Sequence, residues 1–250
     1  MKPADLWQPV HDELARWRHA GLTPELWLRD DDAIKPSSRL DRLIAFTEEF
    51  RIPLALAIVP RLTGPALARH LEGVPHVHPV IHGWAHANHA PWPTKKQELG
   101  AHRPRQIVLR DITKGLKRLA ELYGERLVPM LVPPWNRIDP DLLGHLPGLG
   151  FRGLSTFGHS LESQPGLAVV NTHIDFIDWR GGVVCIDHAK LVAALAQELA
   201  WARDHGGRPI GILSHHIDND EMGYRFLRDL FTAAPPGLAR WRTPGELMAG

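Results

Sequence analysis

The stretch Leu26-Trp27-Leu28-Arg29-Asp30-Asp31-Asp32 is the most informative in the sequence, because a short apolar run passes directly into three acidic residues. The apolar part is typical of a β-strand, so the acidic residues lie where that strand ends. Adjacent carboxylates repel one another, and a nearby cation or a raised pKa must offset that cost. A solvated turn or a helix N-cap needs fewer than three carboxylates, which favours a cation-binding site.

Apolar runs followed by polar residues recur along the chain and alternate with amphipathic stretches. In addition to residues 26–29, we predict strands at 54–59, 77–81, 127–132, 151–155 and 209–213. We predict helices at 39–50, 65–71, 107–123, 140–149, 190–205 and 221–231. Strands that are apolar throughout are typical of parallel sheets, which are buried on both faces. No repeat or linker divides the chain, so we predict one α/β barrel-like domain over residues 1–250.

Polar residues gather at the ends of four of these strands. The clusters are residues 30–32, His82, residues 133–136 and residues 215–216. In parallel α/β barrels the catalytic groups collect at the carboxyl ends of the strands. The four clusters therefore predict one shared site.

The segment His82-Gly83-Trp84-Ala85-His86 has two histidines four residues apart. On a helical turn this spacing places both imidazoles on one side, where a divalent ion such as Zn²⁺ can bind them. The simpler alternative is a pair of solvated loop histidines. A carboxylate from residues 30–32 would complete a three-ligand site with open positions, which is the arrangement of catalytic rather than structural zinc.

Ser214-His215-His216 closes the last predicted strand, and His215 could donate a proton to a leaving group. A surface histidine pair before a helix is the alternative. Carboxylates later in the chain could orient the imidazole, as they do around many catalytic histidines. The candidates for that role are Asp175, Asp178 and Asp187.

Composition excludes several other classes of protein. The formal net charge is +1 and no long basic run occurs, so we expect no nucleic-acid partner. No segment resembles a signal peptide or a membrane span, so we expect a cytoplasmic protein without a membrane partner. The single cysteine, Cys185, rules out an intrachain disulfide and a cysteine-based zinc site. It lies in an apolar run, and we expect it to be buried in a strand.

Taken in order, these segments resemble the motifs of the polysaccharide deacetylases, carbohydrate esterase family 4. The matching segments are Asp31-Asp32, His82-Gly83-Trp84-Ala85-His86, Pro133-Pro134-Trp135, Asp178-Trp179 and Leu213-Ser214-His215. A register one residue earlier, with Asp30 and Asp31 as the acidic pair, is the alternative. The chain departs from the family pattern at Val132, where the family has an arginine that holds the catalytic aspartate. Either Arg29 or Arg137 would then replace that arginine, or the base would be tuned in a different way.

The resemblance implies a distorted (β/α)7-like barrel and a set of site residues. Asp32, His82 and His86 would bind one divalent ion. Zn²⁺ is the expected metal, and Co²⁺, Ni²⁺ and Mn²⁺ are the alternatives. Asp31 would act as the base and His215 as the acid. The metal and a backbone N–H near Trp135 would hold the oxyanion. The residues assigned to the substrate are Trp84, Pro134, Trp135, Arg29 and Asp178, although the two tryptophans could equally be packing residues.

The function implied is hydrolysis of an N-acetyl or O-acetyl group, on a sugar or a small glycan. A second hypothesis is a metal-dependent amidohydrolase that cleaves a non-sugar C–N bond in a small molecule. A third is a metal- or sugar-binding protein without turnover, although a binding protein needs neither the base nor the acid. The expected partner is a small-molecule or oligosaccharide substrate, and the sequence leaves the oligomeric state open.

Overall fold

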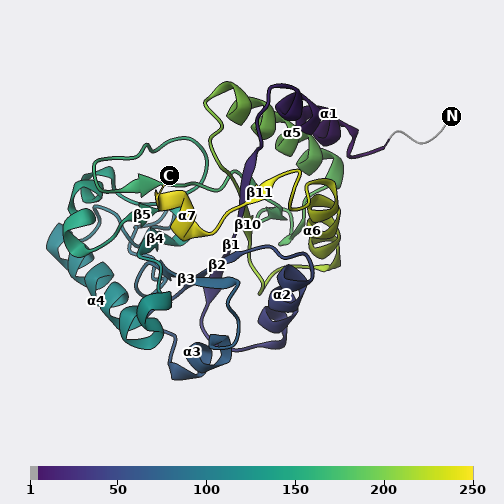
Figure 1. Cartoon of the computed structure of the whole chain (residues 1–250). Helices are drawn as coiled ribbons and strands as arrows, with labels where there is room; N and C mark the ends of the chain where they lie inside the picture. The colour runs from purple at the N-terminus through teal and green to yellow at the C-terminus, as the bar shows by residue number, and fades with distance from the viewer. Residues whose placement is uncertain (1–4, 250) are drawn as a thin grey trace.

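The computed structural model describes residues 5–249 and contains a curled parallel β-sheet surrounded by helices (Figure 1). The strands of this sheet are β1 (Glu25–Ala33), β2 (Leu54–Ile58), β3 (Val77–His82), β4 (Met130–Val132), β5 (Gly153–Leu154), β6 (Ala168–Val169), β7 (Ile174–Asp175), β10 (Ile210–Ser214) and β11 (Arg240–Trp241). Two further strands, β8 (Ile177–Asp178) and β9 (Val184–Cys185), form an antiparallel hairpin.

The helices described within residues 5–249 are α1 (Gln8–His19), α2 (Ser38–Glu49), α3 (Pro65–Leu71), α4 (Arg105–Tyr123), α5 (His188–Asp204), α6 (Glu221–Ala233) and α7 (Pro244–Ala249). Short 3-10 helices cover Gly124–Arg126, Pro134–Asn136, Pro140–His145 and Pro147–Leu149. Helices α2 to α6 lie around the outside of the strands, and α7 lies across them (Figure 1). No helix of this part of the chain is long and apolar enough to cross a membrane.

The order of the strands requires the sheet to curl. The sheet runs β6-β5-β4-β3-β2-β1-β10-β7, with β11 beside the start of β1, and every pairing in it is parallel. The two edge strands, β6 and β7, are therefore consecutive in the chain. Only residues 170–173 separate them, and five extended steps span roughly 18 Å at most. The edges must come together, which gives the predicted distorted barrel.

Side chains of the sheet alternate between the barrel interior and the helices outside, with the period of two that strands have. In β1, Trp27 packs in an inner cluster with alanine and valine side chains of β2 and β3. Leu26 and Leu28 belong to the larger core beneath the helices. Arg29 and Asp31 follow the parity of Trp27, so the strand directs two charged side chains into the barrel.

The elements differ from the sequence prediction at several points. Strand β1 runs on to Ala33, so the acidic residues belong to the strand instead of following it. Helices α1 and α7 were not predicted, and residues 140–149 form two 3-10 helices because Pro147 interrupts a longer helix. Cys185 lies in a strand as expected but is only half-buried, since it belongs to the short hairpin outside the main sheet.

Candidate active site

The three adjacent aspartates of β1 point to different surroundings. Asp30 lies on the outer face, where it accepts a hydrogen bond from Ser214 Oγ (2.6 Å) and lies 2.5 Å from His216 Nδ1. Asp31 lies on the inner face. Asp32 has a positive φ of 72°, and the register between β1 and β2 shifts beside it. Such an irregularity re-aims a side chain, and it brings Asp32 to the same end of the barrel as Asp31.

Asp32 forms a three-residue cluster with His82 and His86. Its Oδ1 lies 3.1 Å from His82 Nε2 and 3.2 Å from His86 Nε2. His82 ends β3, and its Nδ1 is 3.0 Å from the carbonyl oxygen of Val132. A carbonyl only accepts, so this nitrogen carries the proton and Nε2 of the neutral ring presents a lone pair.

The donor set of this cluster fits a divalent cation. Asp32 Oδ1 is buried and has no hydrogen-bond partner among the described residues. It faces an imidazole nitrogen of His82 that has no proton to give it when the ring is neutral. Two imidazoles and one carboxylate, with the second histidine nitrogen held by a carbonyl, form a set typical of catalytic zinc sites.

A second group of potential ligands, His159, His173 and Glu198, fits a cation less well. The backbone N–H of Gly211 donates to His173 Nδ1 (3.1 Å). Nδ1 therefore carries no proton, and in the neutral ring the proton is on Nε2. That nitrogen has no lone pair for a metal. In His82 the proton is on Nδ1 instead, and Nε2 keeps its lone pair. The cluster of Asp32, His82 and His86 is therefore the better candidate for a metal site.

The charges of the cluster shift the pKa values of its members. Burial would raise the pKa of Asp32, but contact with His82 and the charge of His86 lower it well below its ordinary value. Burial lowers the pKa of His86, and the nearby carboxylates do not reverse this. Burial also disfavours charged His82, but Asp31 and Asp32 raise its pKa overall. Asp32 is thus kept ionised and His86 tends toward the neutral form, as metal binding requires.

Arg29 holds Asp31 in a fixed orientation. Its Nε and Nη2 donate to the two carboxylate oxygens of Asp31, each at 2.9 Å, and it is completely buried. The remaining donors reach Ser155 Oγ (2.6 Å) and Asn136 Oδ1 (2.6 Å). The sequence left open whether Arg29 or Arg137 holds the aspartate, and in the structure Arg29 does so. Arg137 donates to the carbonyl of Lys96 instead.

The loop that carries the two histidines is fixed by a buried carboxylate. Glu98 is 1% exposed and accepts the backbone N–H groups of Ala85 (2.8 Å) and Trp84 (3.2 Å). Gly83 has a positive φ of 56°, and a Cβ there would lie 2.3 Å from Glu98 Oε2 and 2.6 Å from Pro134 Cδ. Only glycine fits between the carboxylate and the proline, so this residue sets how the loop leaves β3.

His215 follows β10, the strand beside β1, and lines the same pocket. It is 8% exposed, and its Nδ1 has no hydrogen-bond partner among residues 5–249. The ring of Trp179 contacts it edge-on, with 4.6 Å between ring centroids. Asp175 accepts the Trp179 indole N–H (2.7 Å) and so fixes that ring. Burial raises the pKa of Asp175, against the effect of these hydrogen bonds.

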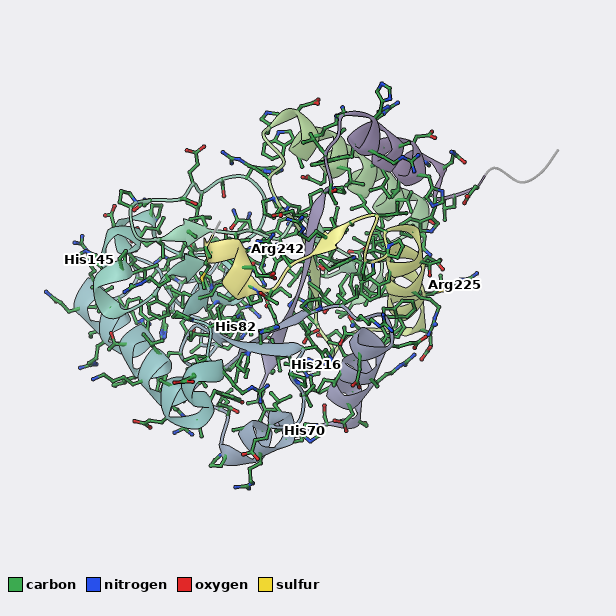
Figure 2. All side chains as sticks on the ribbon, in the orientation of Figure 1. His70, His82, His145, His216, Arg225 and Arg242 are labelled. Atoms are coloured by element: carbon green, nitrogen blue, oxygen red, sulfur yellow. The ribbon has the colours of Figure 1, made fainter. Side chains whose placement is uncertain are left out.

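One pocket of about 710 Å³ joins these groups at the carboxyl ends of the strands. It is lined by Asp31, Asp32, His82, His86, Lys96, Trp135, Asn136, Arg137, Phe157, Asp175, Trp179, Arg180 and His215. Figure 2 shows His82 in the middle of the molecule, whereas His145 and Arg225 lie at its periphery.

The predicted base, acid and metal ligands therefore meet in one pocket, together with Trp135. The other four residues assigned to the substrate do not line it. Arg29 lies behind Asp31, Pro134 packs against Gly83, and the backbone N–H of Trp84 is bound to Glu98. Asp178 accepts the backbone N–H groups of Arg180 and Gly181.

Several lining residues were not predicted, because they come from irregular segments. Lys96, Phe157 and Arg180 lie in loops that carry no motif of their own. The only signal in the sequence was their position after strand runs, which is too general to select them. The pocket is thus built from elements that only the closed barrel brings together.

The comparisons with known proteins agree with this architecture. No protein-family model matches the sequence, and no curated protein is similar to it. Solved structures do match. A proposed polysaccharide deacetylase from Mycobacterium smegmatis superposes with a TM-score of 0.66 and 16% identity, covering 91% of this chain and 90% of that one.

Two further structures have named activities. A family 4 acetyl xylan esterase from Clostridium thermocellum, solved with a cobalt ion, has a TM-score of 0.53 and 15% identity, with 90% of each chain covered. The chitin deacetylase of Colletotrichum lindemuthianum has a TM-score of 0.56 and 15% identity, covering 90% of this chain and 88% of that one.

The structure therefore defines an α/β barrel with a candidate metal site at the carboxyl ends of its strands. More particularly, its fold is that of the polysaccharide deacetylases and family 4 carbohydrate esterases. The resemblance predicted from the motifs is confirmed at the level of the fold, and so is the distorted (β/α)7-like barrel.

Proposed function

We propose that the protein is a metal-dependent deacetylase that hydrolyses an N-acetyl or O-acetyl group on a sugar or a small glycan. The observation that carries this proposal is the Asp32, His82 and His86 cluster, whose Asp32 Oδ1 lacks a donor, in a pocket shared with Asp31 and His215. The fold is consistent with it, since solved structures with this fold include an esterase and deacetylases.

Asp32, His82 and His86 would hold the ion, with Zn²⁺ as the first choice for this donor set and Co²⁺, Ni²⁺ or Mn²⁺ as alternatives. A divalent ion bound there would supply Lewis-acid polarisation of the acyl carbonyl and would lower the pKa of water. The contact of His82 Nδ1 with the Val132 carbonyl leaves Nε2 as the nitrogen that would bind the ion.

Asp31 is the proposed general base. Arg29 takes one lone pair of each of its carboxylate oxygens, so each oxygen keeps another for the proton of the attacking water. His215 is the proposed general acid for the leaving amine or alcohol, because its side chain lines the same pocket as Asp31.

Trp135 is the proposed source of an oxyanion donor. Its backbone N–H makes no hydrogen bond among the described residues, and a positive φ of 56° holds the backbone in a strained conformation beside the pocket. Its ring, 4.4 Å from that of His86, forms part of the pocket wall.

The first test is the metal content of the purified protein, measured by elemental analysis. We expect about one divalent ion per chain, lost in the His82→Ala, His86→Ala variant. The matched control is His159→Ala, His173→Ala, which removes two histidines from the other cluster and should keep the ion. No uptake of Zn²⁺, Co²⁺ or Ni²⁺ by folded wild-type protein would overturn the proposal.

Substrate class is the second part of the test. The loaded protein is assayed with acetylated sugars, chitin oligomers and small non-sugar amides. Release of acetate from sugars supports the deacetylase proposal, whereas release of amine only from non-sugar amides would identify an amidohydrolase. Metal binding without turnover of any of these would favour a binding protein, although Asp31, fixed by Arg29, and His215 in the same pocket argue against it.

A further inference from the structure

Three cationic side chains line the candidate active-site pocket: Lys96, Arg137 and Arg180. They come from loops that follow β3, β4 and β8, so they approach the pocket from different elements. None of the three forms an ion pair with any residue in the range 5–249. The ion pairs within the pocket join Asp31 to Arg29, and Asp32 to the two histidines.

The acidic side chains of the pocket are already committed. Both oxygens of Asp31 accept from Arg29. Asp32 belongs to the proposed metal cluster, whose ion would add further positive charge. Asp175 accepts from the Trp179 indole and the backbone N–H of Ile177. No acidic group of the described pocket lining forms an ion pair with Lys96, Arg137 or Arg180.

The same pocket also has flat apolar side chains in its wall. Trp135, Phe157 and Trp179 line it, and the last two are 41% and 45% exposed. Lys96 Nζ lies 6.0 Å from the centre of the Trp135 ring. Arg137 is half-buried, and its Nη1 is held by the carbonyl of Lys96 at 2.9 Å, which limits its movement. The cations thus stand beside surfaces suited to a ring, within one cavity.

We propose that this pocket accepts an acylated substrate that carries an anionic group, a carboxylate or a phosphate, bound by Lys96, Arg137 and Arg180. Lysine and arginine form strong charge-assisted hydrogen bonds with both anions. The acyl group then lies at the cluster of Asp32, His82 and His86 while the anion lies among the three cations. The inference rests on the proposed deacetylation, and it narrows the substrate from sugars in general to anionic ones.

The test compares three compounds with the same acetamido sugar: N-acetylglucosamine, N-acetylmuramic acid, which adds a carboxylate, and N-acetylglucosamine 6-phosphate. We expect kcat/KM to be at least tenfold higher for one of the anionic compounds than for the neutral one. The variant Lys96→Gln, Arg137→Gln, Arg180→Gln should lose most of that preference, chiefly through KM, with its metal content and unfolding midpoint retained.

The matched control carries the same change of three charges elsewhere: Lys95→Gln, Arg69→Gln, Arg225→Gln. These side chains are exposed and do not line the pocket, and Arg225 lies at the periphery in Figure 2. The preference should persist in this control. Equal loss in the control and in the pocket variant would show a general effect of net charge and would overturn the proposed anion site.

Binding without turnover separates this inference from the proposed function. Calorimetry on the metal-loaded protein compares glucosamine, muramic acid and glucosamine 6-phosphate, and we expect tighter binding of an anionic compound, weakened tenfold or more in the pocket variant. Selective binding with no hydrolysis would support the anion site and count against the deacetylase. Hydrolysis with equal kcat/KM for the neutral and anionic compounds would support the deacetylase and count against the anion site.

Discussion

Asp30, Asp31 and Asp32 are adjacent, yet each has a different partner. Asp30 pairs with Ser214 and His216 outside the barrel, and Asp31 pairs with Arg29 inside it. Asp32 turns to the histidines through its positive φ. The repulsion expected from the sequence is thus relieved by giving two of the carboxylates their own cationic or hydrogen-bonding partner. Asp32 Oδ1 has no hydrogen-bond donor among the described residues, which is why we propose Asp32 as the metal ligand.

This separation predicts how amide substitutions affect metal binding. Asp32→Asn should weaken Zn²⁺ binding at least 100-fold, because it removes the anionic ligand. Asp30→Asn should change it less than threefold, since Asp30 faces away from the cluster. Competition with a fluorescent chelator measures both affinities. A larger loss in the Asp30 variant would reverse the register of the acidic pair.

Arg29 gives a second prediction at this scale, which does not depend on activity. Arg29→Met leaves Asp31 buried without its partner, and such a loss costs about 3–5 kcal/mol. Adding Asp31→Asn should recover part of this cost, because the remaining buried charge is removed. Urea unfolding of the wild type, both single variants and the double variant measures the coupling. Additive effects would mean that the pair is not coupled.

At the residue scale, the motifs predicted which side chains lie in the same pocket. They did not predict the direction in which each side chain points. The spacing of His82 and His86 indicates a shared ligand without any structure. The choice between Asp30 and Asp32 depends on one dihedral angle and a change of register. Asp rarely adopts positive φ outside special sites, and no local pattern in the sequence marks it.

At the scale of elements, the loop after β3 is the least regular part of the site. Residues 83–104 contain no helix, and the loop's histidine turn is held by hydrogen bonds from Trp84 and Ala85 to Glu98. A buried carboxylate that accepts backbone N–H groups substitutes for the regular structure that the turn lacks. Its removal leaves two half-buried donors without this acceptor.

Glu98→Ala should therefore lower the free energy of unfolding by about 1–3 kcal/mol, at about 0.5–1.5 kcal/mol for each hydrogen bond lost. It should also weaken metal binding about tenfold, because the loop positions His86. Thermal unfolding and chelator competition test the two effects. Glu121→Ala, at an exposed position of α4, serves as the control and should change neither. Metal affinity unchanged in Glu98→Ala would mean that the loop does not depend on this carboxylate.

The elements that the sequence predicted best are those with a strong apolar period. Residues 107–123 were predicted as a helix and form most of α4, and the strands at 54–59 and 77–81 are present as β2 and β3. Residues 155–187 contain only short strands and carry Phe157 and Trp179 to the pocket. Their positions depend on tertiary contacts, which local periodicity does not encode.

At the scale of the whole molecule, the two ends of the barrel have different chemistry. The carboxyl ends of the strands carry the candidate active site. A second cavity of about 710 Å³ lies by the start of β1 and β10, and His173 lines it beside Arg242 and Glu246. Arg242 is labelled in Figure 2. Alternation of strands and helices predicted a barrel, but not the order of its strands, in which β10 lies beside β1.

This second cavity predicts how stability depends on pH. Burial and the neighbouring His159 lower the pKa of His173 to about 4, from an ordinary value of 6.5. The folded chain therefore keeps this imidazole neutral where the unfolded chain binds a proton. The resulting stabilisation is complete above pH 6.5 and is lost as the pH falls through 4. It amounts to about 3.5 kcal/mol, at about 1.4 kcal/mol for each unit of pKa.

Urea unfolding between pH 4 and pH 7.5, with chelator present to remove the effect of metal, measures this dependence. In His173→Asn the amide oxygen can replace Nδ1 as the acceptor for Gly211 without titrating. The variant should therefore lose stability less steeply than the wild type between pH 6.5 and 4. His145→Asn, at an exposed position, should follow the wild type. Parallel curves for wild type and His173→Asn would show that His173 is protonated equally in the folded and unfolded chain. Its burial would then not lower its pKa.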